Sequence, residues 1–145
     1  MRSVNDPRHI ARILAVMDLY EHFFGKDIEG MSILDTEELE IGNYSNKLRE
    51  SILNGVKEKH SEIDELINKY SDPVKTTDLD LVQLQVLRIS VYEGFIAKTI
   101  PPKVAVDEAI ELTRDFGMDV SAKKIAGILG KIFDIFAKEE KEVEK

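Results

Sequence analysis

Few residues in this chain could support catalysis or hold a metal ion. The sequence has no cysteine and only three histidines, His9, His22 and His60, so it cannot form disulfides or thiolate zinc sites. On one continuous helix, His9 and His22 would lie about 20 Å apart, too far to share a metal ion. No HExxH, GxSxG, GxGxxG or phosphate-loop motif occurs. We therefore predict a protein that is not an enzyme and that has no metal site and no cofactor.

The charged residues are unevenly distributed. The chain has 28 acidic and 20 basic residues and a net charge of -8, which argues against strong binding to nucleic acid. The stretch 27–40 contains acidic residues but no basic one, and it lacks the ligand spacing of a calcium loop, so it is interpreted as solvated acidic surface. Residues 1–24 carry three arginines against three acids. A local basic patch is therefore compatible with the overall charge.

Helix signals occur along the whole chain. Asp6 can cap free backbone N–H groups and Pro7 suits the first position of a helix, which the apolar repeat continues to about Gly25. Capping signals at Ser61 and Asp78 predict two further helix starts. The longest apolar run has five residues, too few to span a membrane, and the N-terminal residues do not resemble a signal peptide. We therefore predict a cytoplasmic protein.

The C-terminal half shows the strongest hydrophobic pattern. A helix from Asp78 to about Ala97 is apolar almost all round and is predicted to be central. Pro101 and Pro102 break the chain, and Gly117 can close the next helix in the left-handed conformation. No segment alternates with a period of two, so we predict an all-α fold of six or seven helices. The predicted organisation is one domain over residues 1–145, with an N-terminal helical subdomain at 5–70, a C-terminal helical subdomain at 76–138 and a solvated tail at 139–145.

Two motifs in this half are specific. They read LRISVYE at residues 87–93 and IPPKVAVDEAIEL at residues 100–112, and Phe116–Gly117 follows. Their order and spacing resemble those of the transcription antitermination factor NusB family. Weaker similarity at the first helix, including Arg12 and Tyr20, extends the resemblance over about residues 8–136.

The resemblance implies both a fold and a function. NusB-like proteins are all-α, with two small packed helical subdomains, and they act in transcription antitermination and ribosomal RNA synthesis. They bind boxA RNA together with the ribosomal protein NusE. The expected partners are therefore a boxA-like RNA, NusE and the transcription elongation complex, with no membrane. Homodimerisation, which occurs in some relatives, is left open.

The resemblance also implies individual site residues. In the family, basic residues at the start of the first helix contact phosphates, but here the basic run reads Arg8-His9-Ile10. In the last helix, Lys124 replaces a family Phe and Ala126 a family Asn, so a stacking ring and an amide are lost. Tyr20 matches a family Tyr, although a core position explains it equally well. The implied RNA-binding residues are Arg2, Arg8, His9, Arg12, Tyr20, Lys123 and Lys124.

Three further expectations concern the central helix and the function as a whole. Gln83 and Leu84 stand where the family approaches NusE and are predicted to bind a partner, unless Leu84 is simply buried. Arg88 is expected to pair with Glu108 or Glu111, because a buried arginine is costly without a carboxylate.

An alternative function is a protein-interaction module of the same fold that has lost RNA recognition. The same fold also precedes some ribosomal RNA cytosine methyltransferases, but that interpretation requires a longer chain.

Overall fold

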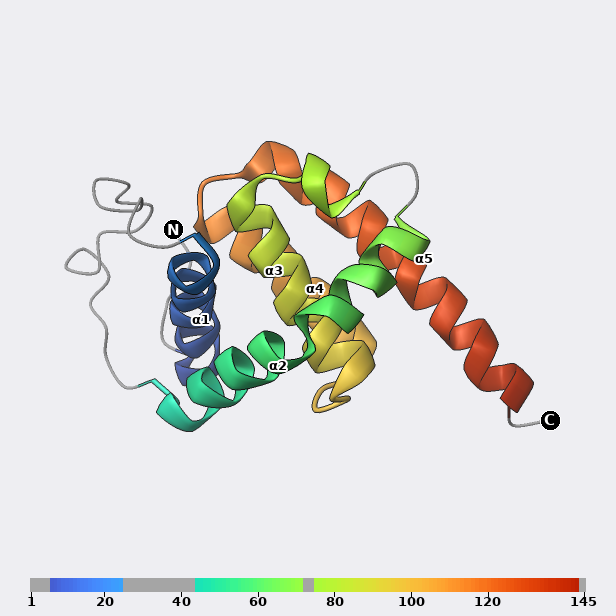
Figure 1. Cartoon of the computed structure of the whole chain (residues 1–145), viewed down its shortest axis with the longest axis horizontal. Coiled ribbons are helices and arrows are strands. Elements are labelled where there is room, and N and C mark those ends of the chain that lie inside the picture. Colours follow the sequence, from blue (N-terminus) through green and yellow to red (C-terminus); the bar gives the residue numbers. More distant parts are fainter. Residues whose placement is uncertain (1–5, 25–43, 72–74, 144–145) are drawn as a thin grey trace.

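The chain folds into a helical bundle. The computed structural model describes residues 6–24, 44–71 and 75–143 (Figure 1). In these residues there is no strand, which confirms the all-α prediction, and there are five α-helices rather than six or seven. A 3-10 turn, η2 (Thr76–Asp78), precedes the central helix, and a π-helical turn, η3 (Tyr92–Ile96), follows it. The α-helices are α1 (Pro7–Phe24), α2 (Asn46–Tyr70), α3 (Leu81–Val91), α4 (Pro102–Asp115) and α5 (Asp119–Val143).

Helix α3 is the centre of the bundle, as its apolar sequence predicts. Every residue from Val82 to Val91 is buried, and the helix contacts each of the other four α-helices. Figure 1 shows α1 to the left of it, α2 running across the lower part of the bundle toward α5, and the long α5 behind. A helix enclosed on all sides needs apolar residues around its whole circumference, which explains why α3 lacks a polar face.

The helix boundaries follow local capping chemistry, with two corrections. As predicted, α1 begins beside Asp6, whose carboxylate accepts a backbone N–H of the first turn at 2.9 Å. The predicted helix start at Ser61 is wrong, because α2 runs through it without a break and keeps burying the same apolar face. The predicted cap at Asp78 is also wrong. Asp80 caps α3 instead, accepting the N–H of Val82 at 2.9 Å.

Two glycines have defined structural roles. A Cβ at Gly55 in α2 would lie 2.1 Å from the Cζ and hydroxyl oxygen of Tyr92, so this glycine leaves room for the end of the Tyr92 ring against α2. Gly117 follows α4 with a φ of 74°, the left-handed conformation that its position predicts.

Some predictions lie at the edges of the described residues or outside them. Arg2 and the acidic stretch 27–40 lie outside. The predicted tail from residue 139 begins within α5, which continues to Val143. Among the described helices, none combines the length and the apolar character that crossing a bilayer requires.

Candidate functional site

The start of α1 is held by buried ion pairs. Arg12 is 6% exposed, and its guanidinium donates to both carboxylate oxygens of Glu93, at 2.8 and 3.0 Å. Glu108 lies 3.8 Å from the same guanidinium. This two-point geometry neutralises the arginine and connects α1 to η3.

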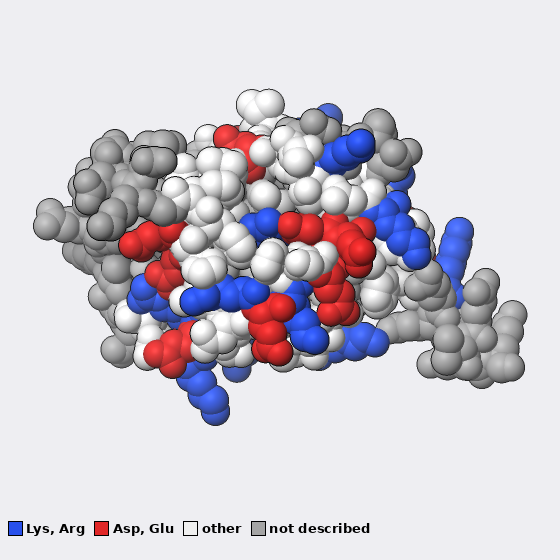
Figure 2. All heavy atoms as spheres, viewed as in Figure 1, with Lys and Arg blue, Asp and Glu red and all other residues white. Residues whose placement is uncertain are grey.

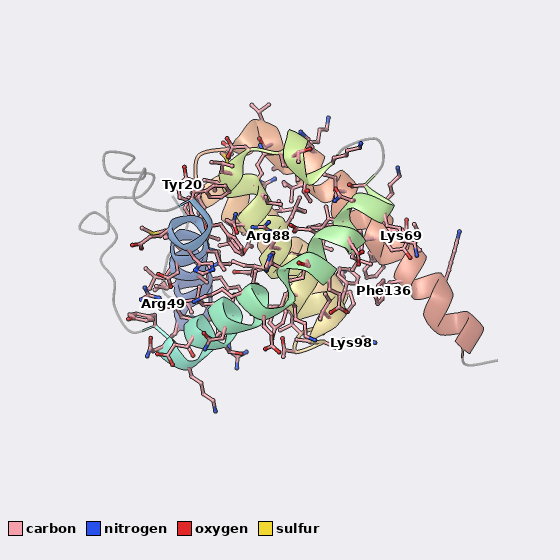
Figure 3. The ribbon with its side chains drawn as sticks, viewed as in Figure 1. Tyr20, Arg49, Lys69, Arg88, Lys98 and Phe136 are labelled. Atoms are coloured by element: carbon pink, nitrogen blue, oxygen red, sulfur yellow. The ribbon has the colours of Figure 1, made fainter. Side chains whose placement is uncertain are left out.

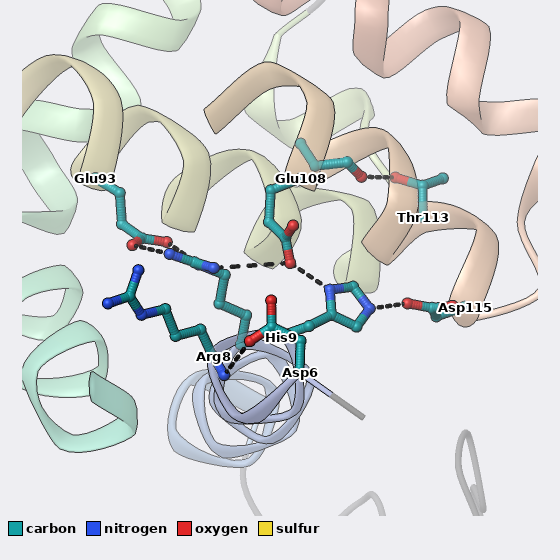
Figure 4. Close-up of polar contacts among 9 residues, drawn as sticks. Asp6, Arg8, His9, Glu93, Glu108, Thr113 and Asp115 are labelled. Atoms are coloured by element: carbon teal, nitrogen blue, oxygen red, sulfur yellow. Dashed lines mark hydrogen bonds and ion pairs between the residues drawn. The ribbon is translucent and has the colours of Figure 1, made fainter. Parts of the chain in front are cut away.

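His9 forms the second part of this ion-pair cluster (Figure 4). Its ring nitrogens contact two carboxylates of α4, Nδ1 that of Glu108 and Nε2 that of Asp115. Burial by itself lowers the pKa of His9, but the hydrogen bonds to Asp115 and Glu108 outweigh it and raise the pKa to about 9. At neutral pH the imidazole is therefore a cation that bridges two turns of α4.

The charges of this cluster nearly balance. Two cations, Arg12 and protonated His9, face the three carboxylates of Glu93, Glu108 and Asp115. The two basic side chains are thus occupied by acids of the same chain. Their geometry fits a role in fixing α1 against η3 and α4, rather than in offering free positive charge to a ligand.

Within the described residues, one group of side chains has a spacing that could hold a metal ion, and two of its three members belong to this cluster. Ligand atoms of His9, Glu108 and Glu111 lie within 4.8 Å of one another. However, protonated His9 and the Arg12 guanidinium already supply positive charge to Glu108. We interpret these residues as an ion-pair cluster.

Exposed basic residues lie close to the cluster along the chain. Arg8 is exposed one residue before His9, and Lys123 and Lys124 are exposed in the second turn of α5. Asp115, which binds His9, lies only four residues before the start of α5. The His9–Asp115 contact therefore brings the start of α1 beside the segment that leads into α5. Arg114 is also exposed at this end of α4, and no motif in the sequence indicated it.

The structure buries the other predicted site residues. Tyr20 is 7% exposed and belongs to the core, with its ring centroid 5.3 Å from that of Phe24. Leu84 is buried in the same core, which decides between the two alternatives left open for it. Gln83 is also buried and donates its side-chain amide to the Ser121 hydroxyl, joining α3 to the first turn of α5.

The predicted pairing of Arg88 with Glu108 or Glu111 is wrong. Arg88 instead donates to both carboxylate oxygens of Asp64 on α2, at 2.9 and 2.7 Å. Its guanidinium carbon also lies 4.4 Å from the ring centroid of Phe23, a cation–π contact. Figure 3 shows Arg88 in the middle of the bundle, near α2, and Arg49 between α1 and α2.

Arg49 makes an equivalent connection between α1 and α2. Its guanidinium donates to both carboxylate oxygens of Asp18, at 2.6 and 2.8 Å. The hydrogen bonds to Asp18 raise the pKa of this arginine. Together with Arg12 and Arg88, it makes three arginine–carboxylate pairs that join different helices of the bundle.

The class of protein follows from this architecture. The described chain is an all-α bundle fixed by buried and half-buried arginine–carboxylate pairs, with exposed basic residues near the starts of α1 and α5. The model of the NusB family matches residues 9–134. The chain belongs to the NusB family.

Individual relatives agree with this assignment. A transcription antitermination protein NusB of Coxiella burnetii is 34% identical over 127 residues, covering 87% of this chain and 91% of the relative. Among solved structures, NusB of T. maritima has a TM-score of 0.66 and 34% identity, covering 91% of this chain and 92% of its own. A chain in the crystal structure of a plectonemic RNA supercoil has a TM-score of 0.72 at 21% identity, with 89% and 95% covered, and shows the fold alone.

Proposed function

We propose that this protein is a non-catalytic transcription antitermination factor of the cytoplasm. It binds a boxA-like RNA together with NusE, within the elongation complex that synthesises ribosomal RNA. The single observation that carries the proposal is membership of the NusB family over residues 9–134. The exposed basic residues near the starts of α1 and α5 supply a surface on which RNA phosphates can bind.

The proposed RNA contacts differ from those that the resemblance implies. Arg8, Lys123 and Lys124 are exposed and would contact phosphates. Arg12 and His9 bind carboxylates inside the protein, so we assign them the role of positioning α1. The proposed RNA-binding surface would then contain fewer basic residues than the family resemblance implies.

The charge distribution of this chain implies that a protein partner must contribute to RNA binding. On the face shown in Figure 2, basic and acidic side chains are interleaved and form no broad basic surface. Three phosphate contacts to a single strand correspond to a salt slope of only about -2 in log affinity against log salt. Such binding is weak at physiological salt, and NusE would provide the remaining affinity.

Fluorescence titration of a boxA RNA, with and without NusE and at two salt concentrations, tests this function. The triple variant Arg8→Gln/Lys123→Gln/Lys124→Gln should lose affinity and nearly all salt dependence. The matched control Lys47→Gln/Lys59→Gln/Lys103→Gln removes three exposed charges from α2 and α4 and should bind like the wild type. Absence of RNA binding by the wild type under every condition would refute the proposal.

A second candidate function is a protein-interaction module without RNA recognition. The observation that favours it is the neutralisation of Arg12 and His9 by internal carboxylates. This candidate requires a stable complex with NusE and no change in RNA affinity in the triple variant. The same titrations therefore distinguish the two functions.

A further inference from the structure

A groove lies between the C-terminal half of α2 and the C-terminal half of α5. Its volume is about 590 Å³, which is within the range of natural ligand sites. Figure 3 shows Lys69 of α2 and Phe136 of α5 close together at this place. The described side chains that line the groove are Leu66, Phe95, Ile96, Phe136, Glu62, Glu65 and Lys69.

The floor of the groove is apolar and held in place by ring packing. The rings of Phe95 and Phe136 meet edge to face, with their centroids 5.1 Å apart. Phe95 is 3% exposed, but Phe136 is only half-buried. Leu66 and Ile96 beside them are also half-buried. An apolar side chain of a ligand would therefore gain free energy by covering this floor.

The groove lies apart from the residues proposed to bind RNA. Helix geometry places its lining residues on the face of α2 nearly opposite Asp64, whose carboxylate binds Arg88. Along α5, Phe136 follows Lys123 by 13 residues, which corresponds to about 20 Å. The groove is thus a separate surface.

The rim of the groove on α2 is acidic. Glu62 and Glu65 are exposed, and Glu62 lies 3.9 Å from Lys59 in a pair whose side chains are 62% and 47% exposed. Such an exposed pair contributes little and can be exchanged for a pair with a ligand. Among the described lining residues Lys69 is the only base, and its amine lies over the Tyr70 ring, 5.0 Å from the centroid.

The surroundings of the groove do not reverse this negative charge. Figure 2 shows acidic side chains gathered over the C-terminal half of α2. The last seven residues of the chain, EEKEVEK, carry four acids and two bases, and the whole chain has a net charge of -8. A polyanion such as RNA is repelled by such a rim, whereas a basic ligand is attracted.

We propose that this groove is a docking site for a basic amphipathic helix of a protein partner. Apolar side chains of that helix cover the floor, and its lysines or arginines lie beside Glu62 and Glu65. The lining of α2 from Glu62 to Lys69 extends about 10 Å, or nearly two helical turns. This length suits a helix that presents apolar residues at intervals of three and four. The inference goes beyond the proposed function, because it does not depend on RNA.

A fluorescent peptide of about 18 residues, long enough to form a helix, tests this inference. The peptide has leucines on one face and lysines on both flanks, and a second peptide has glutamate in place of each lysine. In fluorescence anisotropy titrations, the wild type should bind the lysine peptide and not the glutamate peptide.

Two pairs of substitutions at the rim give the sharpest comparison. Glu62→Gln/Glu65→Gln should weaken binding of the lysine peptide roughly threefold to tenfold, because exposed ion pairs contribute modestly. Glu62→Lys/Glu65→Lys should bind the glutamate peptide instead. The control Glu21→Gln/Asp107→Asn makes the same change in charge at exposed positions of α1 and α4 and should bind like the wild type.

The floor is tested by Phe136→Ala, which should weaken binding of the lysine peptide further. Thermal unfolding checks that this variant is folded. The glutamate variants change only exposed side chains, so they test the inference even if Phe136→Ala is unstable.

Several outcomes would overturn the inference. They are no binding of the lysine peptide by the wild type, and equal weakening in the rim variant and the control. A third is sedimentation that shows a wild-type dimer which Phe136→Ala dissociates, because the groove would then hold a second copy of this chain. None of these outcomes affects the proposed function, which the boxA titration tests at Arg8, Lys123 and Lys124.

Discussion

The buried imidazole of His9 predicts a specific dependence of stability on pH. Its pKa is about 9 in the folded protein, compared with 6.5 for an ordinary histidine. A group whose pKa is raised by folding stabilises the native state fully below the unfolded pKa and loses this contribution as the pH rises through the folded value. The stabilisation by His9 should therefore be complete below about pH 6.5 and absent above about pH 9.

The size of the effect follows from the same two values. One pKa unit corresponds to about 1.4 kcal/mol, so the change from 6.5 to about 9 corresponds to about 3 kcal/mol of unfolding free energy. His9 itself is 6% exposed, but the side chains of Glu108 and Asp115 are 16% and 20% exposed, so water reaches the acceptors. We accordingly expect a measured loss of about 2–3 kcal/mol between pH 6 and pH 9.5.

Urea unfolding at a series of pH values measures this loss. The useful quantity is the difference in unfolding free energy between the wild type and His9→Gln, because other titrating groups contribute similarly to both proteins. His22→Gln is the matched control, since it removes an exposed histidine from the same helix. A titration of the histidine ring resonances by NMR gives the pKa of His9 directly.

Two results would contradict this reasoning. One is a His9 resonance that titrates near pH 6.5. The other is a difference between wild type and His9→Gln that stays constant from pH 6 to pH 9.5. Either result would mean that the carboxylates of α4 do not hold the proton on the ring in solution.

Four other substitutions test the packing. Gly55→Ala should destabilise the fold by about 1–3 kcal/mol, because the new methyl group meets the ring of Tyr92, and thermal unfolding measures the loss. Glu93→Gln should cost about 3–5 kcal/mol, because it leaves a buried guanidinium without its carboxylate; an effect below 1 kcal/mol would contradict the assignment of this ion pair. Gly117→Ala should destabilise by about 1 kcal/mol because of its positive φ, whereas Gly127→Ala should stabilise by about 1 kcal/mol, and the two thermal shifts should have opposite signs.

His9 and Arg12 at the start of α1 differ from their expected roles because they pair with carboxylates that are distant in the sequence. The sequence resemblance implied phosphate contacts for His9 and Arg12, as for Arg8. In the structure, Arg12 and Glu93 are 81 residues apart in sequence, and His9 and Glu108 are 99 apart. No spacing rule connects residues so distant. The sequence does allow one inference: an arginine among apolar residues needs a carboxylate partner, because burying an unpaired charge is costly. Which carboxylate is the partner depends on the fold.

Local chemistry determined much of this protein from its sequence. The apolar repeat predicted the all-α class, the apolar circumference of α3 predicted its central place, and Asp6 and Gly117 marked helix ends correctly. These features depend on residues within one or two helical turns, so they can be read from the sequence. The motifs at residues 87–93 and 100–112 identified the family for the same reason, as ordered local patterns.

Only the tertiary structure decided which side chains are available to a ligand. Arg88 pairs with Asp64 rather than with α4, Leu84 and Tyr20 are core residues, and Arg12 is neutralised by Glu93. Periodicity indicates which face of a helix is apolar, but the partner facing each polar group depends on how the helices cross. The free energy of a buried charge depends on that partner, and for this reason the surface available to RNA emerges only when the helices are assembled.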